Sequence, residues 1–370
     1  MRRVHAALLA AATALAVIAA PAARAAPEET DRFGLQRRLD DVVAAGAVGA
    51  LAEVRDEHGV WRGTSGVAEL GTTRAVPVDG RFRVGSVSKT FVATVVLQLV
   101  DEGRLRLDDT VEAWLPGVVP GGHRVTVRHL LNHTSGLYDY LATLPMPPRS
   151  DFLANRWRTW TAAELVARAV ANNPTFEPPG SAFGYSNTGY LLLGQIVDRV
   201  TGSSYGAEIE RRVVEPLRLR GTSVPGTFPR IRGPHPRGYV PTGQDGEDLV
   251  DYTKMNPSVM GAGGEMISST RDLNRFFAAL LGGRLLPVHL LDEMKTPGVE
   301  HSRYGLGLAW WRDTSCGVRV YGNDGDAVAY QSWSFSTEDG GHQVTVALTP
   351  DFSGDLDVAV DAFLNEALCG

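Results

Sequence analysis

The chain has 370 residues, of which 44% are hydrophobic and 21% charged, an ordinary globular composition with room for two domains. Its formal net charge of −6 argues against a nucleic-acid partner, because nucleic acid favours a basic face. The two cysteines and nine scattered histidines show no metal-ligand spacing, so we expect neither a metal nor another cofactor.

The first 25 residues have the pattern of an export signal. Arg2 and Arg3 form a basic start, residues 6–20 are apolar, and Ala23-Arg24-Ala25 is typical of a cleavage site. The remaining sequence offers no apolar run of about 18–20 residues for a membrane span. We therefore expect a secreted, monomeric protein that is cleaved near Ala25.

The first quarter of the mature chain predicts a helix, two strands joined by a hairpin, a short strand and a second helix. These elements are expected at residues 31–45, 46–54, 60–67, 82–84 and 91–100. The second helix is apolar on nearly every face, which places it inside a domain, and Gly103 is a plausible stop after it.

Ser86 and Lys89 stand at the beginning of this apolar helix. Residues three apart share a helix face, with about 5–6 Å between their Cβ atoms. A buried lysine can give up its proton, whereas an arginine cannot, so Lys89 can activate the Ser86 hydroxyl. The alternative is an N-cap serine followed by a surface charge.

The middle of the chain predicts helices and loops without a strand ladder. Helical patterns occur near residues 125–131, 190–200 and 205–214, and residues 160–164 open a further helix; proline-rich connections separate them. After a helix that Ser269 caps, the sequence returns to strands and ends in a helix. The β-rich runs lie at 305–311, 318–321, 327–336 and 344–348, and the final helix at 358–368.

Strands at both ends of the chain predict an α/β (α+β) fold with one antiparallel sheet. Helices from both ends would flank this sheet. We expect residues 26–106 and 258–370 to form the sheet domain and residues 107–257 an inserted, mainly helical domain. The active cleft is expected where the two meet.

Two further stretches carry groups suited to catalysis or binding. In the first, Tyr185 can move a proton, and the amide of Asn187 can position a substrate carbonyl or Lys89. Its alternative is an aromatic and polar loop packed on its own helix. The second, residues 322–326, is expected to open the strand that runs to Ser336. Its alternative is a simple turn, since Asn, Asp and Gly are the usual turn residues.

In this order, the three stretches resemble the serine penicillin-recognising hydrolases, a β-lactamase/transpeptidase-like family. Within that family the chain is similar to secreted Streptomyces-type D-alanyl-D-alanine carboxypeptidases and class C β-lactamases. Residues 84–89 match the nucleophile motif and residues 185–187 the second motif. Helper stretches match at residues 99–103, 133–140, 267–270 and 304–308.

The resemblance implies a two-step reaction in which Ser86 forms an acyl-enzyme, while Lys89 and Tyr185 move protons. It implies that Asn187 holds the substrate amide, and that the backbone N–H groups of Ser86 and Asp326 form the oxyanion hole. His133 is implied to be structural.

The two cysteines, Cys316 and Cys369, can pair in an oxidising compartment, which would stabilise the fold by about 4 kcal/mol in the chain-entropy model. From the sequence alone they can also be two separate buried thiols. The resemblance implies the disulfide, because this subgroup carries one beside the strand of the third motif.

The third motif departs from the family pattern of His or Lys, then Thr or Ser, then Gly. Here the residues are Asn323, Asp324 and Gly325. In the carboxypeptidases an arginine on the preceding strand clamps the substrate carboxylate; that position matches Trp310, with Arg312 close by. We expect residues 323–326 and Trp310 to contact substrate.

Asp324 and Asp326 bring negative charge to this strand. Two like charges about 4 Å apart repel by about 1 kcal/mol in water and about 4 kcal/mol at an effective dielectric constant of 20. An anionic substrate would lose about tenfold to a thousandfold in affinity.

Two hypotheses follow. In the first, the chain is an exported serine hydrolase or acyltransferase that has lost selectivity for a free C-terminal carboxylate. It would act on peptide, amide or ester carbonyls, including peptidoglycan-derived ones, and prefer esters, amides, internal peptide bonds or amine-bearing substrates. In the second, the chain is a non-catalytic or acylation-only protein that binds peptidoglycan fragments or β-lactams.

Overall fold

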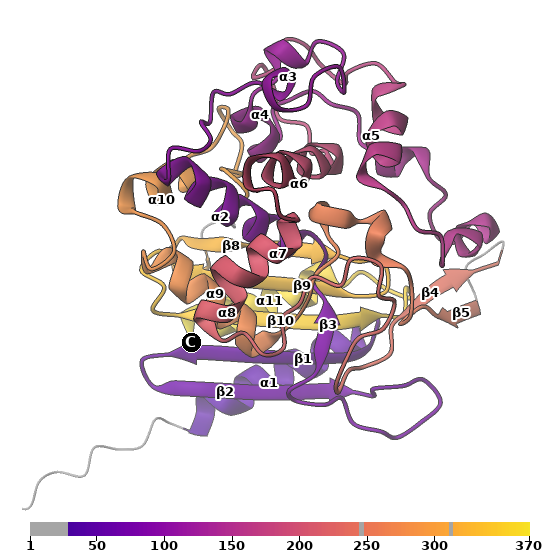
Figure 1. Ribbon diagram of the computed structural model, residues 1–370. Coiled ribbons are helices and arrows are strands. Elements are labelled where there is room, and N and C mark those ends of the chain that lie inside the picture. Colours follow the sequence, from indigo (N-terminus) through magenta and orange to yellow (C-terminus); the bar gives the residue numbers. More distant parts are fainter. Residues whose placement is uncertain (1–28, 244–247, 311–313) are drawn as a thin grey trace, which may run out of the picture.

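The computed structural model describes residues 29–243, 248–310 and 314–370 (Figure 1). The expected export signal and its cleavage site lie outside these ranges, as does Arg312. None of the helices in the described ranges combines the length and the apolar character that a membrane crossing requires.

A six-stranded antiparallel sheet forms the base of the molecule (Figure 1). Its order is β2 (Gly59–Gly66), β1 (Ala47–Asp56), β10 (Gln343–Pro350), β9 (Gln331–Thr337), β8 (Val320–Asp326) and β7 (Ala309–Trp310). The N-terminal hairpin therefore pairs with the C-terminal strands, and the α/β fold with an antiparallel sheet is confirmed.

Both faces of the sheet are covered. Successive residues of a strand point to opposite faces. Accordingly, Ala50 packs with α1 (Glu29–Ala44) and α11 (Asp357–Cys369), whereas its neighbour Leu51 joins the larger core on the other side. Helix α9 (Thr270–Leu281) contacts β1, β9 and β10 and belongs to that larger core.

The apolar helix predicted after Ser86 is α2 (Ser88–Asp101), and every residue from Ser88 to Leu97 is buried. Phe91 stacks on Phe276 of α9 with 3.7 Å between ring centroids. The helix ends as expected, because Gly103 follows it with a φ of +67°, a left-handed conformation that glycine adopts readily.

The remaining helices are mostly short, and several begin at polar caps. The hydroxyls of Thr126, Thr161 and Ser269 accept N–H groups in the first turns of α4, α5 and α9. In Figure 1, α3 to α6 gather on the side of the sheet away from β1 and β2. Their bounds are α3 Val111–Trp114, α4 Val127–Leu131, α5 Ala162–Val170, α6 Asn187–Thr201, α7 Tyr205–Ile209, α8 Glu215–Leu217 and α10 Val288–Lys295. We keep residues 107–257 as the proposed extent of the helical domain.

The expectation that the middle region has no strand ladder is wrong. The middle region does contain a hairpin, β4 (Tyr239–Thr242) with β5 (Asp248–Asp251). Pro241 within β4 obscured it, because proline is rare inside strands except in edge positions. A second small sheet pairs β3 (Arg81–Arg83) with β6 (Ile267–Ser269).

Residues 322–326 do not open the strand that runs to Ser336. They end a strand of their own, β8, and β9 begins only at Gln331. The turn-type residues of this stretch are held in a strand by pairing with β9, where Asn323 faces Ser334. Tertiary contact thus overrides a local preference for a turn.

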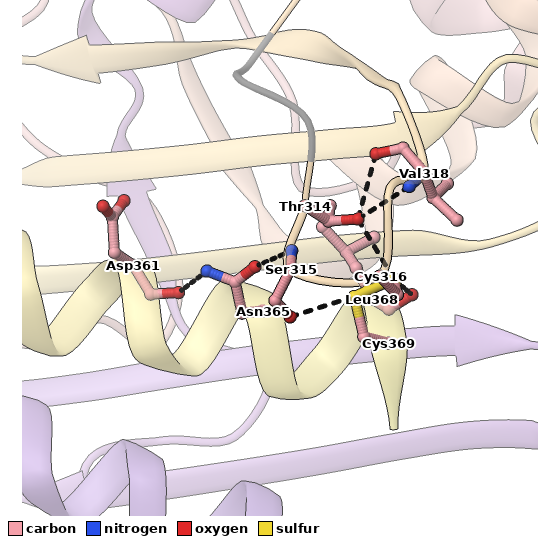
Figure 2. The surroundings of a disulfide bond; sticks show 8 residues. All are labelled: Thr314, Ser315, Cys316, Val318, Asp361, Asn365, Leu368 and Cys369. Carbon is pink, nitrogen blue, oxygen red and sulfur yellow. Dashed lines mark hydrogen bonds between the residues drawn. A yellow bond between two sulfur atoms is a disulfide. The ribbon is translucent and has the colours of Figure 1, made fainter.

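Cys316 and Cys369 form a disulfide that joins the segment before β8 to the end of α11 (Figure 2). Beside it, the backbone N–H of Ser315 donates to Asn365 of α11 over 2.8 Å. The bridge therefore ties the approach to β8 to the helix that covers the back of the sheet.

Replacing both cysteines, Cys316→Ser with Cys369→Ser, should lower the free energy of unfolding by about 4 kcal/mol, because the bridged residues are 53 positions apart and their cross-link restricts the unfolded chain. Denaturant titration of the oxidised wild type and the double variant measures this difference. Wild type unfolded in the presence of a reductant should match the variant. A loss below about 1 kcal/mol would contradict the prediction.

Candidate active site

Ser86 lies in a tight turn, Gly85–Val87, that leads directly into α2. The turn needs a glycine before the serine. Gly85 has a φ of +51°, and a Cβ atom at this position would lie 2.5 Å from the carbonyl oxygen of Asp326. The end of β8 therefore packs against the turn that presents the Ser86 hydroxyl.

Lys89 is fully buried, and its ammonium nitrogen lies 3.0 Å from Ser86 Oγ. The same nitrogen donates to Asn187 Oδ1 over 2.7 Å and to the carbonyl oxygen of Gly263 over 2.6 Å. Asn187 in turn donates to Asp139 over 2.8 Å, which fixes the orientation of its amide. The amine is thus aimed at the serine by groups on two different segments.

Burial lowers the pKa of Lys89 to about 7, and the nearby carboxylates of Asp139 and Asp324 only partly oppose this shift. A substantial fraction of the amine is therefore neutral at neutral pH. A neutral amine within hydrogen-bond distance of a hydroxyl can accept its proton.

The Tyr185 hydroxyl lies 2.7 Å from Ser86 Oγ, on the side of the serine that opens to solvent. Burial and the neighbouring Tyr304 raise the pKa of Tyr185 well above its ordinary value, although its hydrogen bond to Ser86 acts in the opposite direction. The phenol therefore keeps its proton at neutral pH. It can relay a proton, while Lys89 is the better initial acceptor.

The third-motif residues occupy different depths. Asn323 is buried, and its amide lies 3.2 Å from Thr90 Oγ1 and 3.5 Å from the carbonyl oxygen of Ser86. A Cβ atom at Gly325 would lie 2.0 Å from the carbonyl oxygen of Val84 and 2.9 Å from the nitrogen of Ser86. These two residues thus hold β8 against the serine turn from behind.

Asp324 and Asp326 lie on the opposite, exposed face of β8. Partial loss of solvent raises the pKa of both carboxyls, and at Asp324 a backbone hydrogen bond and the charge of Lys89 counteract the rise. Asp326 Oδ1 accepts the N–H of Val328 over 2.6 Å. Trp310 lies in β7, but its side chain is outside the described part of the structure.

A cavity of about 580 Å³ opens at the serine. Ser86, Tyr185, Asn187 and Asp326 line one part of it, and the rest is mostly apolar. Sequence reasoning missed the apolar lining, although aliphatic residues within a proline-rich connection were a usable signal. The lining includes Leu141, Leu144, Met146, Met255, Met260 and Phe352.

His133 supports the second motif from below. It is buried, its Nδ1 accepts the N–H of Ser186 over 3.2 Å, and its ring centroid lies 4.1 Å from that of Tyr185. Burial lowers the pKa of His133 well below its usual value, and the charge of Lys89 adds to the effect. The neutral imidazole thus packs under the phenol and does not reach Ser86. Among the residues that the structure describes, no group of histidine, cysteine or acidic side chains is arranged to hold a metal ion.

Comparison with known proteins gives consistent results. A family model described as Beta-lactamase matches residues 35–366. Penicillin-binding protein 4 of Amycolatopsis lactamdurans is 37% identical over 42% of this chain and 39% of its own length. Esterase EstB of Burkholderia gladioli is 34% identical over 51% of this chain and 52% of its own length. D-aminopeptidase of Brucella anthropi is 31% identical over 47% of this chain and 32% of its own length. The chain spans about half or less of each of these curated relatives.

Two solved structures match over nearly the whole chain. The D-stereospecific amidohydrolase from Streptomyces sp. has a TM-score of 0.82 and 42% identity, with 92% of this chain and 99% of that chain covered. The D-amino acid amidase from Ochrobactrum anthropi SV3, complexed with L-phenylalanine amide, has a TM-score of 0.79 and 29% identity, with 91% and 98% covered. With the family match across residues 35–366, these findings show that the chain belongs to the Beta-lactamase family of serine hydrolases.

Proposed function

We propose that this protein hydrolyses amide or ester bonds through an acyl-enzyme on Ser86, and that it acts on substrates without a free carboxylate beyond the scissile bond. The observation that carries the proposal is the contact of the Ser86 hydroxyl with both Lys89 and Tyr185, at distances of 3.0 and 2.7 Å. The names of the relatives, an amidohydrolase, an amidase and an esterase, support this reaction class.

In the acylation step, Ser86 Oγ forms a bond to the substrate carbonyl carbon and its proton passes to the neutral amine of Lys89. The carbonyl oxygen becomes an oxyanion, which the backbone N–H groups of Ser86 and Asp326 stabilise. The bond to the leaving group then breaks, and the proton from Lys89 reaches the departing amine or alkoxide by way of Tyr185. Water attacks the resulting ester, releases the acid and restores the Ser86 hydroxyl; an amine can replace water and yield a new amide.

The altered third motif supports the preference for neutral leaving groups. Asp324 stands where the family carries a hydroxyl, and a second carboxylate, Asp326, follows on the same face of β8. Asp326 lines the cleft, and the charge of Asp324 acts on the buried Lys89. These charges would repel a carboxylate on the leaving group, whereas the arginine of the carboxypeptidases would bind it.

The cavity supports a large apolar acyl group. A pocket of about 580 Å³ with aliphatic, methionine and aromatic lining can bury an aromatic or branched side chain. One solved relative is named a D-stereospecific amidohydrolase and the other a D-amino acid amidase, so we propose a hydrophobic D-aminoacyl amide or ester as substrate. We also propose export, on the basis of the basic start at Arg2 and Arg3 and the apolar run that follows.

The test compares kcat/KM for a peptide that ends in D-Ala-D-Ala with that for its C-terminal amide, together with D- and L-phenylalanine amide. We expect the peptide amide to exceed the free acid by about tenfold or more, because the free acid meets like charges. D-phenylalanine amide should exceed its L enantiomer. A preference for the free acid would contradict the proposed function.

A further inference from the structure

We propose that the side chain of Val328 forms a rigid wall of the catalytic cavity beside the reacting carbonyl, and so selects acyl groups with an unbranched β-carbon over those with a branched one. This inference rests on the proposed function and narrows the class of acyl group that the cavity accepts. It is carried by the backbone conformation of Val328, by the hydrogen bonds that hold it and by its position in the cavity.

The backbone of Val328 has a conformation that valine rarely adopts. Its φ is +66°, in the left-handed region, where a β-branched residue is a clear outlier. The N–H of Ala329 donates to the carbonyl oxygen of Ala327 over 2.8 Å, so Val328 is the centre of a three-residue γ-turn. The form of this turn with a positive central φ is rare and strained. Glycine suits such a position best, yet the chain keeps a branched side chain there. Strain of this kind is typical of functional sites.

Contacts on both sides hold the turn in this shape. Asp326 Oδ1 accepts the N–H of Val328 over 2.6 Å, and the N–H of Ala327 donates to the carbonyl oxygen of Tyr330 over 2.8 Å. Tyr330 is buried, and Val328 itself packs against the larger core. The carboxylate of Asp326 therefore acts as a positioning group, because its hydrogen bond fixes a residue that lines the cavity.

Val328 lines the cavity close to the reactive serine. Both Val328 and Ser86 belong to its lining. A Cβ atom at Gly85 would lie within 2.7 Å of the nitrogen and the carbonyl oxygen of Asp326, so the Asp326 backbone contacts the turn that presents Ser86. Val328 follows two residues later, and two residues of chain span at most about 7 Å. In the proposed acylation the N–H of Asp326 holds the carbonyl oxygen, so the part of the acyl group nearest the carbonyl is the part that meets Val328.

The apolar lining differs in how far it can adapt. Two methyl groups on the β-carbon of valine restrict its χ1 angle, and the held turn keeps the Val328 backbone in place. Met146, Met255 and Met260 also line the cavity, and methionine side chains adjust readily to a ligand. A rigid branched group beside the carbonyl disfavours a second branch on the acyl β-carbon, whereas the methionines can accommodate the rest of the side chain. We therefore expect acyl groups such as those of phenylalanine, leucine or norvaline.

The experiment measures kcat/KM for D-norvaline amide and D-valine amide, isomers that differ in whether the β-carbon is branched. Both carry the same α-ammonium and the same leaving group, so the ratio of the two values reports the shape of the acyl group. Wild type should favour D-norvaline amide by about tenfold or more, whereas Val328→Ala and Val328→Gly should bring the two values within about threefold of each other. Val200→Ala is the control, because Val200 is half-buried against the same core but does not line the cavity; it should keep the wild-type ratio.

Two variants of Asp326 test the positioning of Val328. Asp326→Ala removes the acceptor of the Val328 N–H and should lower the ratio of the two amides. Asp326→Asn keeps an oxygen that can accept this N–H, so it should preserve most of the wild-type ratio. Stability measures the strain independently of activity. Val328→Gly should unfold at a higher denaturant concentration than Val328→Ala, because glycine adopts a positive φ without strain and alanine does not.

The outcomes separate this inference from the proposed function. A ratio that stays at its wild-type value in both Val328 variants, or that changes equally in Val200→Ala, would overturn the assignment. If wild type hydrolyses the two amides equally well, the proposed function stands and this inference fails. If it hydrolyses neither amide and Ser86 forms no adduct with a fluorophosphonate, both fail.

Discussion

Replacing Ser86 with alanine is expected to abolish the covalent adduct with a fluorophosphonate and to lower kcat/KM for amides and esters by about 10⁴-fold or more. Among the hydrogen bonds that the described residues make at this site, those of the Ser86 hydroxyl alone involve both Lys89 and Tyr185. Without it, neither the bond to the carbonyl carbon nor the acyl-enzyme can form. Intact-mass spectrometry after incubation with the probe measures the adduct directly.

Ser88→Ala is the matched control for this prediction. Ser88 stands two residues later, is buried, and accepts the N–H of Met266 over 3.2 Å. Its loss removes one buried hydrogen bond and costs about 1 kcal/mol of stability, but labelling should persist. Labelling that survives in Ser86→Ala, or wild type that is never labelled, would favour the binding protein without catalysis.

Lys89→Met is expected to lower the acylation rate by about 10²- to 10⁴-fold, because it removes the proton acceptor while keeping a side chain of similar length. In wild type, activity should rise with pH and reach half its maximum near the lowered pKa of about 7, as the amine becomes neutral. Lys89→Arg should also be inactive, since a guanidinium keeps its proton. A flat rate profile between about pH 5.5 and 8.5 would contradict this role.

The same lysine makes stability depend on pH. The pKa of Lys89 in the folded protein, about 7, is lower than its ordinary value of 10.5. Between these values the unfolded chain holds a proton that the folded protein has released, so the stability of wild type rises with pH through this window. Below it, both states carry the charge, and burying that charge opposes folding by an amount on the order of 5 kcal/mol.

Lys89→Met removes the free-energy cost of burying this charge. The variant should be more stable than wild type at about pH 6, and the difference should shrink towards about pH 9.5. Denaturant titrations of both proteins at the two pH values measure the free energies of unfolding. A difference that is constant with pH would mean that Lys89 keeps its proton in the folded protein throughout this range, so that its pKa is not lowered.

Local patterns were sufficient for most elements and for the pairing of Ser86 with Lys89. Helical geometry places residues three apart on one face, so the spacing alone brought the amine to the hydroxyl, and the structure measures 3.0 Å between them. The hydroxyl cap at Ser269 gave a correct helix start for the same reason, because capping depends on neighbours in sequence.

Features that depend on contacts between residues far apart in the sequence were harder to predict. Residues 322–326 look like a turn and become a strand only because β9 pairs with them and the Ser86 turn packs against them. The apolar cavity lining comes from segments as far apart as Leu141 and Phe352, which no local pattern connects. The contribution of Tyr185 rested on family resemblance, since its distance to Ser86 is set by the whole fold.

The pairing of β1 with β10 has a consequence for how the protein is made. Ala47 lies opposite Pro350, so the central strands are completed only when residues as far as 350 have left the ribosome. Strand β8, which carries Asp326 of the proposed oxyanion hole, is held by pairing with β9 and therefore forms equally late. We expect a nascent chain that stops before these strands to contain Ser86 but to be inactive.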